Sequence, residues 1–397
     1  MHRIPPEFKI VIPEDRIAQH PAADRAHSRL LVVDRQRGMV VHLGVFSDIT
    51  DFIARDLIVL NETRVIPARV EGCRSGGGRV EILFMPETAP DEPDGSPLKV
   101  RALISPARRL RIGVKLALPG GAELTLLHRA PAGGWNCLWE WTHSAVQNST
   151  LRSSTDGHSV FPVSTPPYSP PQAGGEICNP HSERQSSQTG IFPNWLEHFG
   201  LPPLPPYIKR PPEPADCERY QTVYARHPGS LAAPTAGLHF TPELLAELER
   251  VAFCDIVKLT LDVGLGTFQP ILADNLSEHQ MANERYNIPP ETAMRINQAK
   301  SSDRRITMVG TTVVRTLESA ASGGEVIAGE GVASLFIYPP YRFKVVDQLL
   351  TNFHRPDSTL LQLVAALISW DLVNEAYGKA LEAGFCFYSY GDAMLVL

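Results

Sequence analysis

The sequence lacks the patterns of a disulfide-bonded, zinc-binding or membrane-spanning protein. Its six cysteines are scattered over 397 residues and form no Cys-x-x-Cys pair, which argues against a disulfide framework and a structural zinc site. No run of about 18 apolar residues occurs, and the first residues contain no apolar signal segment. We therefore expect a cytoplasmic protein with no metal and no membrane partner.

An excess of basic charge is also missing. Lys and Arg total 37 against 43 Asp and Glu, which gives a net charge of −6. Such a chain does not hold nucleic acid through its overall charge, although a local basic patch can still contact phosphates. The densest basic run contains Arg101, Arg108, Arg109, Arg111 and Lys115. It is either a solvated surface or an RNA-binding site.

Proline, in contrast, is over-represented. The chain contains 35 prolines, where an average use of about 5% predicts about 20. Fourteen of them lie between Pro162 and Pro214. Residues 144–190 combine Ser, Thr, Pro and Gly with few charges and no apolar periodicity, so they bury too little apolar surface to offset the entropy of ordering. This composition predicts a disordered insertion; the alternative is a flexible binding segment.

The remaining chain shows two kinds of secondary-structure pattern. Apolar runs such as residues 57–60 have the length of buried strands, and helices are predicted at residues 242–251, with Thr241 as N-cap, and at 359–373. Residues 65–143 instead contain five short β-rich pieces separated by glycines, which is typical of a small barrel or sandwich.

Strands that alternate with helices predict the α/β class, with a mostly parallel sheet covered by helices on both faces. We expect a discontinuous α/β domain with an inserted small β-barrel domain. The expected boundaries are 1–64 and 191–397 for the α/β catalytic domain, 65–143 for the β-barrel domain, and 144–190 for the disordered insertion.

Polar residues gather where predicted strands lead into helices, the edge at which open α/β sheets bind ligands. His239 lies in a loop of small residues before the helix at 242–251, and Asn352 and His354 precede the helix at 359–373. A lone histidine is more often structural than catalytic, but a helix N-terminus favours anions. The glycines of residues 263–268 either allow a tight turn or contact a ligand.

Two further pairs of residues have a weaker signal. His279 and Glu284 are five positions apart, whereas metal ligands on one helix need a spacing of three or four. Arg315 and Glu318 are three positions apart on one helical face, which is typical of a surface ion pair. A metal site is therefore disfavoured.

Together, several sequence segments that include these residues resemble the S-adenosylmethionine:tRNA ribosyltransferase-isomerases of queuosine biosynthesis. The resemblance covers nearly the whole chain outside 144–190. It rests on residues 17–19, 28–34, 60–69, 204–208, 219–224, 233–241, 263–268, 309–312, 315–319, 351–354 and 389–394.

The resemblance implies a discontinuous α/β domain with an inserted β-barrel, and a specific reaction. The ribosyl moiety of S-adenosylmethionine is transferred to 7-aminomethyl-7-deazaguanine at the tRNA wobble position and isomerised, so that epoxyqueuosine-tRNA forms and adenine and methionine leave. S-adenosylmethionine is then a substrate, tRNA is the partner, and no cofactor is needed. We expect a monomer.

Chemistry suggests roles for the polar residues. The sulfonium of the substrate acidifies the adjacent C5′ hydrogens, so a general base starts the reaction. The catalytic candidates are His239 and His279 for proton transfer, with Asp262 or Glu284 orienting an imidazole or meeting the sulfonium. The candidates for lining the nucleoside pocket are Thr235, Gly237, Gly264, Gly266, Thr267, Asn352 and His354. The candidates for holding substrate or RNA are Asn61, Thr63, Arg64, Arg315 and Glu318.

The chain departs from the family pattern at three places. Ala282 stands where the family has the second histidine of His-x-Met-His-x-Glu, and Asp357 replaces the lysine before Ser-Thr-Leu. The basic Pro-Gly-Lys-Arg segment is represented by residues 106–109. The first two departures favour the main alternative, a diverged non-catalytic tRNA-binding paralogue. A conventional methyltransferase is the third hypothesis, and it predicts S-adenosylhomocysteine as product.

Overall fold

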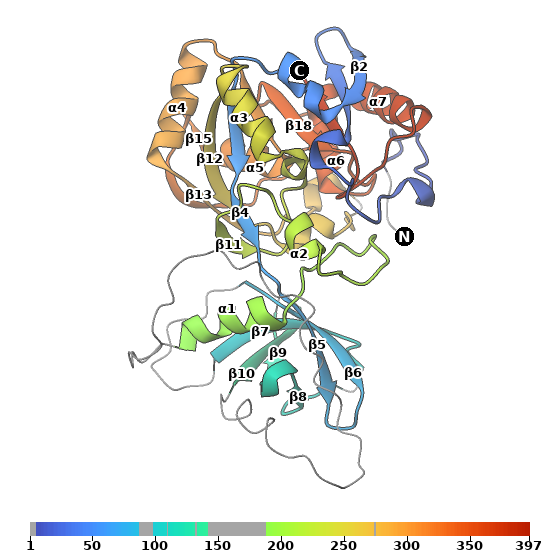
Figure 1. Cartoon of the computed structure of the whole chain (residues 1–397), viewed down its shortest axis with the longest axis vertical. Coiled ribbons are helices and arrows are strands. Elements are labelled where there is room, and N and C mark those ends of the chain that lie inside the picture. The colour runs from blue at the N-terminus through green and yellow to red at the C-terminus, as the bar shows by residue number, and fades with distance from the viewer. Residues whose placement is uncertain (1–4, 87–97, 109, 132, 142–187, 274) are drawn as a thin grey trace. The chain divides into compact units, whose positions relative to one another are not determined.

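The computed structural model describes residues 5–86, 98–108, 110–131, 133–141, 188–273 and 275–397 (Figure 1). The chain forms two compact units. The first comprises Met1–Val65, Leu204–Pro211 and Glu218–Leu397, and the second comprises Ile66–Pro203 and Pro212–Cys217. Within the described ranges, no helix is long and apolar enough to cross a membrane.

The first unit is built on a nine-stranded sheet in the order β17-β13-β12-β3-β14-β18-β19-β1-β2. Its strands are β1 (Arg29–Asp34), β2 (Met39–Val45), β3 (Leu57–Asn61), β12 (Asp255–Leu261), β13 (Glu284–Ile288), β14 (Ile306–Val309), β17 (Gly329–Ala333), β18 (Gln348–Asn352) and β19 (Ala393–Val396). β12, β3, β14 and β18 pair in parallel at the centre, and β19 pairs in parallel with β1. The other pairings are antiparallel.

The central strands are buried on both faces. Every residue of β3 is buried, and Ile58 lies opposite Ile256 of β12 and Thr307 of β14. Continuous apolar runs are typical of parallel strands that helices cover on both sides. For this reason residues 57–60 were recognisable as a buried strand.

Helices pack on the two faces of this sheet (Figure 1). They are η3 (Phe46–Asp51), α3 (Pro242–Arg250), α4 (Pro290–Ser301), α5 (Thr311–Ala320), α6 (Thr359–Ile368) and α7 (Trp370–Glu382). Successive strand residues point to opposite faces. Leu31 accordingly packs in the core with α4 to α7, whereas Leu30 packs in the core with η3 and α3. The predicted α/β class is confirmed.

The ends of these helices follow local signals. Thr241 caps α3 by accepting a hydrogen bond from the Leu244 N–H at 3.2 Å, as predicted. The single helix predicted at 359–373 is wrong, because the structure divides it into α6 and α7. Ser369 between them has a φ of 76°, outside the helical region, and its side chain caps α7 at Leu372.

Short elements complete the first unit. β4 (Thr63–Val65) pairs in parallel with β11 (His227–Ser230), and β15 (Ala321–Ser322) pairs with β16 (Glu325–Val326). Further short helices are η1 (Glu14–Arg16), η2 (Arg25–His27), η6 (Thr235–His239), η7 (Leu265–Phe268) and η8 (Leu276–Glu278). α2 (Asp216–Arg219) lies where the chain passes from the second unit to the first.

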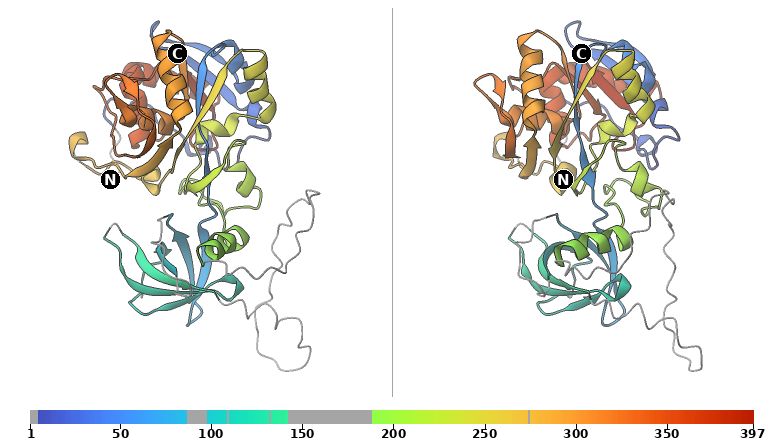
Figure 2. Two further views of the ribbon diagram at one scale, coloured as in Figure 1. Left: turned by 90° about the vertical axis from the view of Figure 1, so that its left-hand side faces the viewer. Right: turned by 60° about the vertical axis from the view of Figure 1, so that its left-hand side comes forward.

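The second unit is a closed six-stranded barrel in the order β10-β7-β6-β5-β8-β9 (Figure 2). Its elements are β5 (Arg69–Arg74), β6 (Arg79–Phe84), β7 (Leu98–Ser105), β8 (Lys115–Ala117), η4 (Pro119–Gly121), β9 (Glu123–Arg129), β10 (Trp135–Glu140) and α1 (Gln188–Phe199). The predicted barrel is confirmed. Five strands were predicted, and the sixth is β5, whose Val-Glu-Gly-Cys centre contains too few apolar residues to stand out.

Helix α1 packs against the barrel through aromatic contacts. Trp195 of α1 packs against Trp139 of β10 with ring centroids 5.6 Å apart, and Phe192 of α1 lies 5.1 Å from Phe84. Residues 191–203 therefore belong to the second unit, whereas the sequence analysis assigned them to the α/β domain. The predicted insertion at 144–190 lies outside the described residues, except for residues 188–190 at the start of α1.

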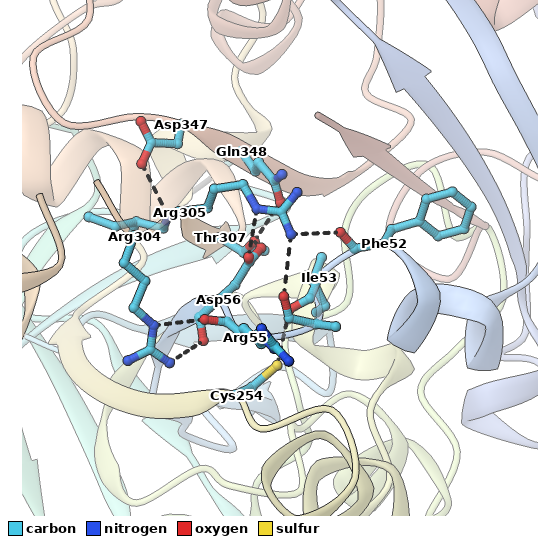
Figure 3. A network of polar contacts seen from close by, with 12 residues as sticks. Phe52, Ile53, Arg55, Asp56, Cys254, Arg304, Arg305, Thr307, Asp347 and Gln348 are labelled. Atoms are coloured by element: carbon cyan, nitrogen blue, oxygen red, sulfur yellow. Dashed lines mark hydrogen bonds and ion pairs between the residues drawn. The ribbon is translucent and has the colours of Figure 1, made fainter. Parts of the chain in front are cut away.

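A polar network ties the amino ends of the central strands together (Figure 3). Arg304 forms an ion pair with Asp255 at the start of β12 and donates hydrogen bonds to the carbonyl oxygens of Arg55 and Asp56. Arg305 pairs with the carboxylate of Asp56 at 2.9 Å. Burial nevertheless raises the pKa of Asp56 to about 6. The network thus connects the segments that lead into β3, β12 and β14.

Thr307 extends this network to β18. Its buried Oγ1 lies 2.7 Å from Oδ2 of Asp56 and 2.9 Å from Oε1 of Gln348 (Figure 3). This hydroxyl, which has one hydrogen to donate, lies between the carboxylate of Asp56, directly before β3, and the side-chain oxygen of Gln348 in β18, on either side of its own strand β14. These contacts lie at the edge of the sheet opposite the carboxyl ends of the parallel strands.

Candidate active site

A cavity of about 630 Å³ lies at the carboxyl ends of the parallel strands. β18 ends there at Asn352, and Gly310 follows β14. The lining comes from residues 232–236 and 310–312, from Val263, Thr267, Phe268, Thr351, Asn352, His354 and Arg355, and from Tyr207, Ser358, Leu360, Tyr388 and Ser389. Open α/β sheets bind ligands at this edge. The cavity is therefore the candidate active site.

Gly310 directs the amino end of α5 into the cavity. It has a φ of 94°, a conformation that glycine adopts without strain, and it turns the chain directly from β14 into the helix. Thr311 and Thr312 of the first turn line the cavity. A helix N-terminus offers unpaired N–H groups and a partial positive charge, so this wall suits electron-rich atoms of a ligand.

Two buried polar atoms of the cavity wall have no hydrogen-bond partner in the part of the chain that the structure describes. They are Oγ1 of Thr312 and Oδ1 of Asn352. A buried polar group without a partner costs roughly 1 to 3 kcal/mol. One hydroxyl and one amide oxygen facing a cavity would regain this energy on a ligand with hydroxyl and amino groups, such as a nucleoside.

His239, at the end of η6, lies directly behind this wall. Its Nε2 is 3.3 Å from Nδ2 of Asn352, its Nδ1 is 2.6 Å from Oγ of Ser28, and its ring stacks on Phe46 with centroids 5.0 Å apart. Burial and the nearby charge of Arg25 lower the pKa of His239 to about 4. The imidazole is therefore neutral at pH 7 and able to accept a proton.

The hydrogen bonds around His239 select one tautomer. Asn352 donates to the carbonyl oxygens of Tyr388 and Gly391, which fixes its Nδ2 toward Nε2 of His239. Ser28 Oγ donates to the carbonyl oxygen of Arg25 and so accepts from Nδ1. This chain of contacts places the proton on Nδ1 and leaves the lone pair on Nε2, the nitrogen on the side of the cavity residue Asn352.

Gly237 is necessary for this arrangement although it lies outside the cavity lining. A Cβ at this position would meet the hydroxyl of Tyr224 at 2.0 Å and Cγ2 of Thr222 at 2.8 Å. Only glycine fits such a close approach. Gly237 therefore lets η6 pack against residues 222–224 and brings His239 to its position.

His354 is the second buried imidazole, and it lines the cavity. Its Nε2 is 2.7 Å from Oγ1 of Thr351, and its backbone N–H and C=O both bond to the hydroxyl of Tyr377. Burial lowers the pKa of His354 to about 3. It is neutral at pH 7 and held firmly in the wall.

Comparisons with known proteins show the family to which the chain belongs. A family model described as "Queuosine biosynthesis protein" matches residues 6–396. The chain belongs to this family. It is 43% identical over 390 residues to the S-adenosylmethionine:tRNA ribosyltransferase-isomerase of Citrifermentans bemidjiense, covering 98% of both chains. It is 41% identical over 394 residues to the Moorella thermoacetica enzyme of that name, covering 98% of this chain and 99% of the relative.

A solved structure from Thermotoga maritima, an S-adenosylmethionine tRNA ribosyltransferase, is 28% identical and matches 98% of this chain and all of its own, with a TM-score of 0.48. The family resemblance inferred from the sequence is confirmed by the family model and the curated relatives. In the described part of the chain, no group of three or more His, Cys, Asp or Glu residues could hold a metal ion.

The other candidates for catalysis lie apart from His239. Glu284 forms a buried ion pair with Arg315 and accepts a hydrogen bond from the Gly264 N–H at 2.9 Å. It thereby fixes the loop at 264–267. His279 is half-buried beside Phe336, with ring centroids 5.0 Å apart, and burial lowers its pKa. Neither Glu284 nor His279 lines the cavity.

Several residues that were predicted to contact substrate form hydrogen bonds within the fold, and their contact with substrate stays a prediction. The side chain of Asn61 is fully buried and bonds to the backbones of Leu261 and Thr63. Thr63 bonds to Ser230 at 2.7 Å and to Asp262 at 3.3 Å, and burial raises the pKa of Asp262. Asn61, Thr63, Ser230 and Asp262 thereby connect β3, β4, β11 and the end of β12. Arg64 is exposed on β4.

Arg315 and Glu318 were predicted to hold substrate or RNA, and the alternative of a surface ion pair between them is wrong. Both side chains are buried, and each has a different partner. Arg315 pairs with Glu284, whereas Glu318 accepts hydrogen bonds from the Tyr341 hydroxyl at 3.0 Å and from the N–H of Val345 at 2.9 Å. The helical spacing was correct, but α5 is covered on this face, so both residues hold loops rather than each other.

Only some residues of the predicted loop at 263–268 line the cavity. Val263, Thr267 and Phe268 line the cavity, whereas Gly264 and Gly266 do not. A Cβ on Gly266 would meet Cβ of Ala282 at 2.6 Å, so the glycine permits close packing there. The glycines therefore serve the turn, and Thr267 is the predicted site residue of this loop that lines the cavity.

The reversed charge at Asp357 is neutralised within the same loop. Asp357 is buried and forms an ion pair with Arg355 at 2.6 Å. Arg355 lines the cavity and also donates to the carbonyl oxygen of Phe268 at 3.2 Å. The departure from the family pattern at this position thus leaves a paired, ordered wall.

The basic run of the second unit stays a prediction. Arg108 and Arg111 are exposed, Arg101 donates to the carbonyl oxygen of Gly133, and Lys115 pairs with Glu123 at 2.5 Å. Arg109 lies outside the described residues. These contacts fit a solvated surface and leave exposed cations for phosphates.

The sequence analysis missed three groups of residues at the site. Ser28 precedes β1, Thr312 follows the β14–α5 turn, and Tyr388 and Ser389 precede β19. All except Ser28 line the large cavity, and Ser28 contacts His239. Thr312 stood in a strand–glycine–threonine string whose position at a helix N-terminus was a usable signal. The position of Tyr388 depends on the pairing of β18 with β19, which no local pattern indicates.

Proposed function

We propose that the cavity at the carboxyl edge of the large sheet binds S-adenosylmethionine and that the chain acts as an S-adenosylmethionine:tRNA ribosyltransferase-isomerase. The ribosyl moiety is transferred to 7-aminomethyl-7-deazaguanine at the tRNA wobble position and isomerised. Epoxyqueuosine-tRNA forms, and adenine and methionine leave. Both substrates place the reaction in the cytoplasm.

The observation that carries this proposal is the pair formed by His239 and Asn352. A buried, neutral imidazole has its basic nitrogen 3.3 Å from an amide whose own oxygen has no partner in the described chain. General base catalysis needs an unprotonated acceptor near the reacting atoms. Family membership supplies the substrate: a sulfonium that makes the adjacent C5′ hydrogens acidic.

In the proposed mechanism, His239 accepts the C5′ proton through Nε2, the nitrogen on the side of the cavity residue Asn352. The proton on Nδ1 remains there and is hydrogen-bonded to Oγ of Ser28, and this contact stabilises the imidazolium that forms. Thr312 and the amino end of α5 bind polar atoms of the nucleoside and hold it in place. Positioning of this kind lowers the entropic part of the barrier.

Product analysis tests the function. The protein is incubated with S-adenosylmethionine and tRNA that carries the deazaguanine precursor, and the digested nucleosides are examined by mass spectrometry. We expect epoxyqueuosine together with free adenine and methionine. S-adenosylhomocysteine would instead indicate a methyltransferase. A folded protein that binds the tRNA but yields no new nucleoside would indicate the non-catalytic paralogue.

Two matched variants test the base. His239→Ala should lower the single-turnover rate of adenine release by about 10² to 10⁴-fold, the usual contribution of a general base. His279→Ala should have a much smaller effect, because its ring packs against Phe336, which does not line the cavity, whereas His239 contacts the lining residue Asn352. The measurement is the single-turnover rate of adenine release, with the melting temperature as a control of folding. A large loss in His279→Ala and a small loss in His239→Ala would transfer the role to His279.

A further inference from the structure

A second cavity, a cleft with about 290 Å³ of empty space that includes its open mouth, lies in the first unit. His239 lines it together with Arg25, Ser28, Arg219 and Ser389. Ser389 also lines the large cavity. The two cavities therefore adjoin each other, with the proposed base His239 beside both.

Two guanidinium groups dominate the wall of this second cavity. Arg25 donates to the carbonyl oxygens of Leu238 and Glu218, both at 2.9 Å. Arg219 donates to the carbonyl oxygens of Ala22 at 2.6 Å and Ala23 at 3.2 Å. Each arginine thus bonds to the backbone of the segment that carries the other, which fixes both groups at the cavity.

The positive charge of this pair is not neutralised within the described chain. Among the described residues, no carboxylate lies within 4.0 Å of either guanidinium, and the carbonyl oxygens that they contact carry only partial charges. Burial and the charge of Arg219 lower the pKa of Arg25, which the nearby Glu218 only partly opposes. Two neighbouring cations that have no carboxylate in ion-pair contact among the described residues favour an anionic ligand.

One donor of the pair is directly free for such a ligand. Nε of Arg219 is buried and has no hydrogen-bond partner among the described residues. An arginine can donate five hydrogen bonds and matches the oxygens of phosphate in a two-point contact. An oxyanion in the cavity would satisfy the buried N–H and the charge at once.

We propose that Arg25 and Arg219 form a binding site for a phosphodiester group of the RNA substrate, next to the nucleotide that is modified. This inference rests on the proposed function. A nucleotide whose base reaches the large cavity carries its phosphates one ribose away, which is the relation that two adjoining cavities offer. S-adenosylmethionine has a net positive charge, so its sulfonium is repelled by two unneutralised guanidinium groups.

Equilibrium binding tests this site without any turnover. The probe is a fluorescent anticodon stem-loop RNA with the precursor base at the wobble position, titrated in the absence of S-adenosylmethionine. Arg219→Gln and Arg25→Gln should each weaken binding about ten-fold or more, as expected for a lost charge-assisted contact. The slope of log K against log salt should fall by about 0.7 for each lost phosphate contact.

Arg250→Gln is the matched control. Arg250 is exposed near the end of α3 and bonds only to the carbonyl oxygen of Ala246 in its own helix, so the same change of charge should leave RNA affinity and salt slope close to wild type. Affinity for S-adenosylmethionine, measured by calorimetry, should be unchanged in Arg219→Gln. Arg219→Lys, which keeps the charge, should bind RNA with intermediate affinity.

A second arm uses the wild-type protein and therefore does not depend on the folding of a variant. RNAs with a neutral methylphosphonate at single positions around the wobble nucleotide should show one position at which wild-type affinity falls about ten-fold. For the RNA with the methylphosphonate at that position, the affinity of Arg219→Gln should be only slightly lower than the affinity of the wild type. If no position has this effect, or if the variants bind RNA as wild type does, the proposal is wrong.

Loss of S-adenosylmethionine affinity with unchanged RNA affinity would also overturn the proposal and would assign the cavity to the methionine carboxylate. The proposed phosphate site and the proposed enzymatic function can be refuted independently of each other. A wild-type protein that shows the phosphate dependence but forms no epoxyqueuosine would keep the site and refute the function.

Discussion

Thr312 and Thr307 are a matched pair of buried threonines at opposite edges of the sheet. Thr312 lines the cavity, and its buried Oγ1 has no partner in the described chain. Thr312→Val removes this unpartnered hydroxyl and its cost of roughly 1 to 3 kcal/mol, so the free energy of unfolding should not fall and should rise by up to that amount. The KM for S-adenosylmethionine should rise about ten-fold, as expected for one lost hydrogen bond. Steady-state kinetics and urea unfolding measure the two quantities, and an unchanged KM would mean that the hydroxyl does not bind substrate.

Residue types predicted part of the site. His239, Asn352 and His354 were identified because they stand where a strand leads into a helix, which is where α/β sheets bind ligands. Gly237 and Glu318 were assigned to substrate, but one is required by the hydroxyl of Tyr224 and the other fixes a backbone loop. The sequence indicates that a polar residue is near an edge. It does not indicate which way the side chain points.

At the scale of elements, Thr307 shows how the sheet is held at its other edge. Its hydroxyl lies between the buried acceptors of Asp56 and Gln348, so Thr307→Val leaves them without this contact (Figure 3). We expect a loss of about 1 to 3 kcal/mol in the free energy of unfolding, with kcat and KM unchanged because the cavity lies at the opposite edge. Thr307→Ser keeps the hydroxyl and should lose less. Equal loss in both variants would mean that packing, not the hydrogen bond, is responsible.

Elements were predictable where a local signal decides them. The buried run of β3 and the Thr241 cap of α3 are such cases. The break between α6 and α7 was missed because residues 359–373 are mostly apolar and contain no glycine or proline, and the decisive feature is a positive φ at Ser369 that a serine rarely adopts. β5 was missed because a barrel strand needs only every second residue to be apolar.

The order of strands in the whole molecule had no signal in the sequence. β3 pairs with β12 and β14, which follow it by about 200 residues or more, and such pairing depends on the assembled core rather than on neighbouring residues. The alternation of strands and helices predicted the α/β class, and the short β-rich pieces separated by glycines in residues 65–143 predicted the barrel. Neither could place β19 between β18 and β1, the arrangement that brings Ser389 to both cavities.

The two buried imidazoles make the stability of the whole molecule sensitive to acid. Burial lowers the pKa of His239 to about 4 and that of His354 to about 3, whereas an unfolded histidine has a pKa of about 6.5. Below pH 6.5 the unfolded chain therefore binds protons that the folded chain excludes, and stability falls as the pH falls toward 4. Each histidine contributes a slope of about 1.4 kcal/mol per pH unit in this window.

His354→Gln separates this effect from other titrations. Asp56 acts in the opposite direction, because its pKa is raised to about 6 in the folded state and it takes up a proton there before it does so in the unfolded chain. The difference between wild type and His354→Gln cancels that term. The wild type should therefore lose about 1.4 kcal/mol more per pH unit than the variant between pH 6 and pH 4.5, measured by urea unfolding at several pH values. Parallel pH curves for the two proteins would show that His354 is protonated in the folded state, and its role as a neutral wall of the cavity would then be wrong.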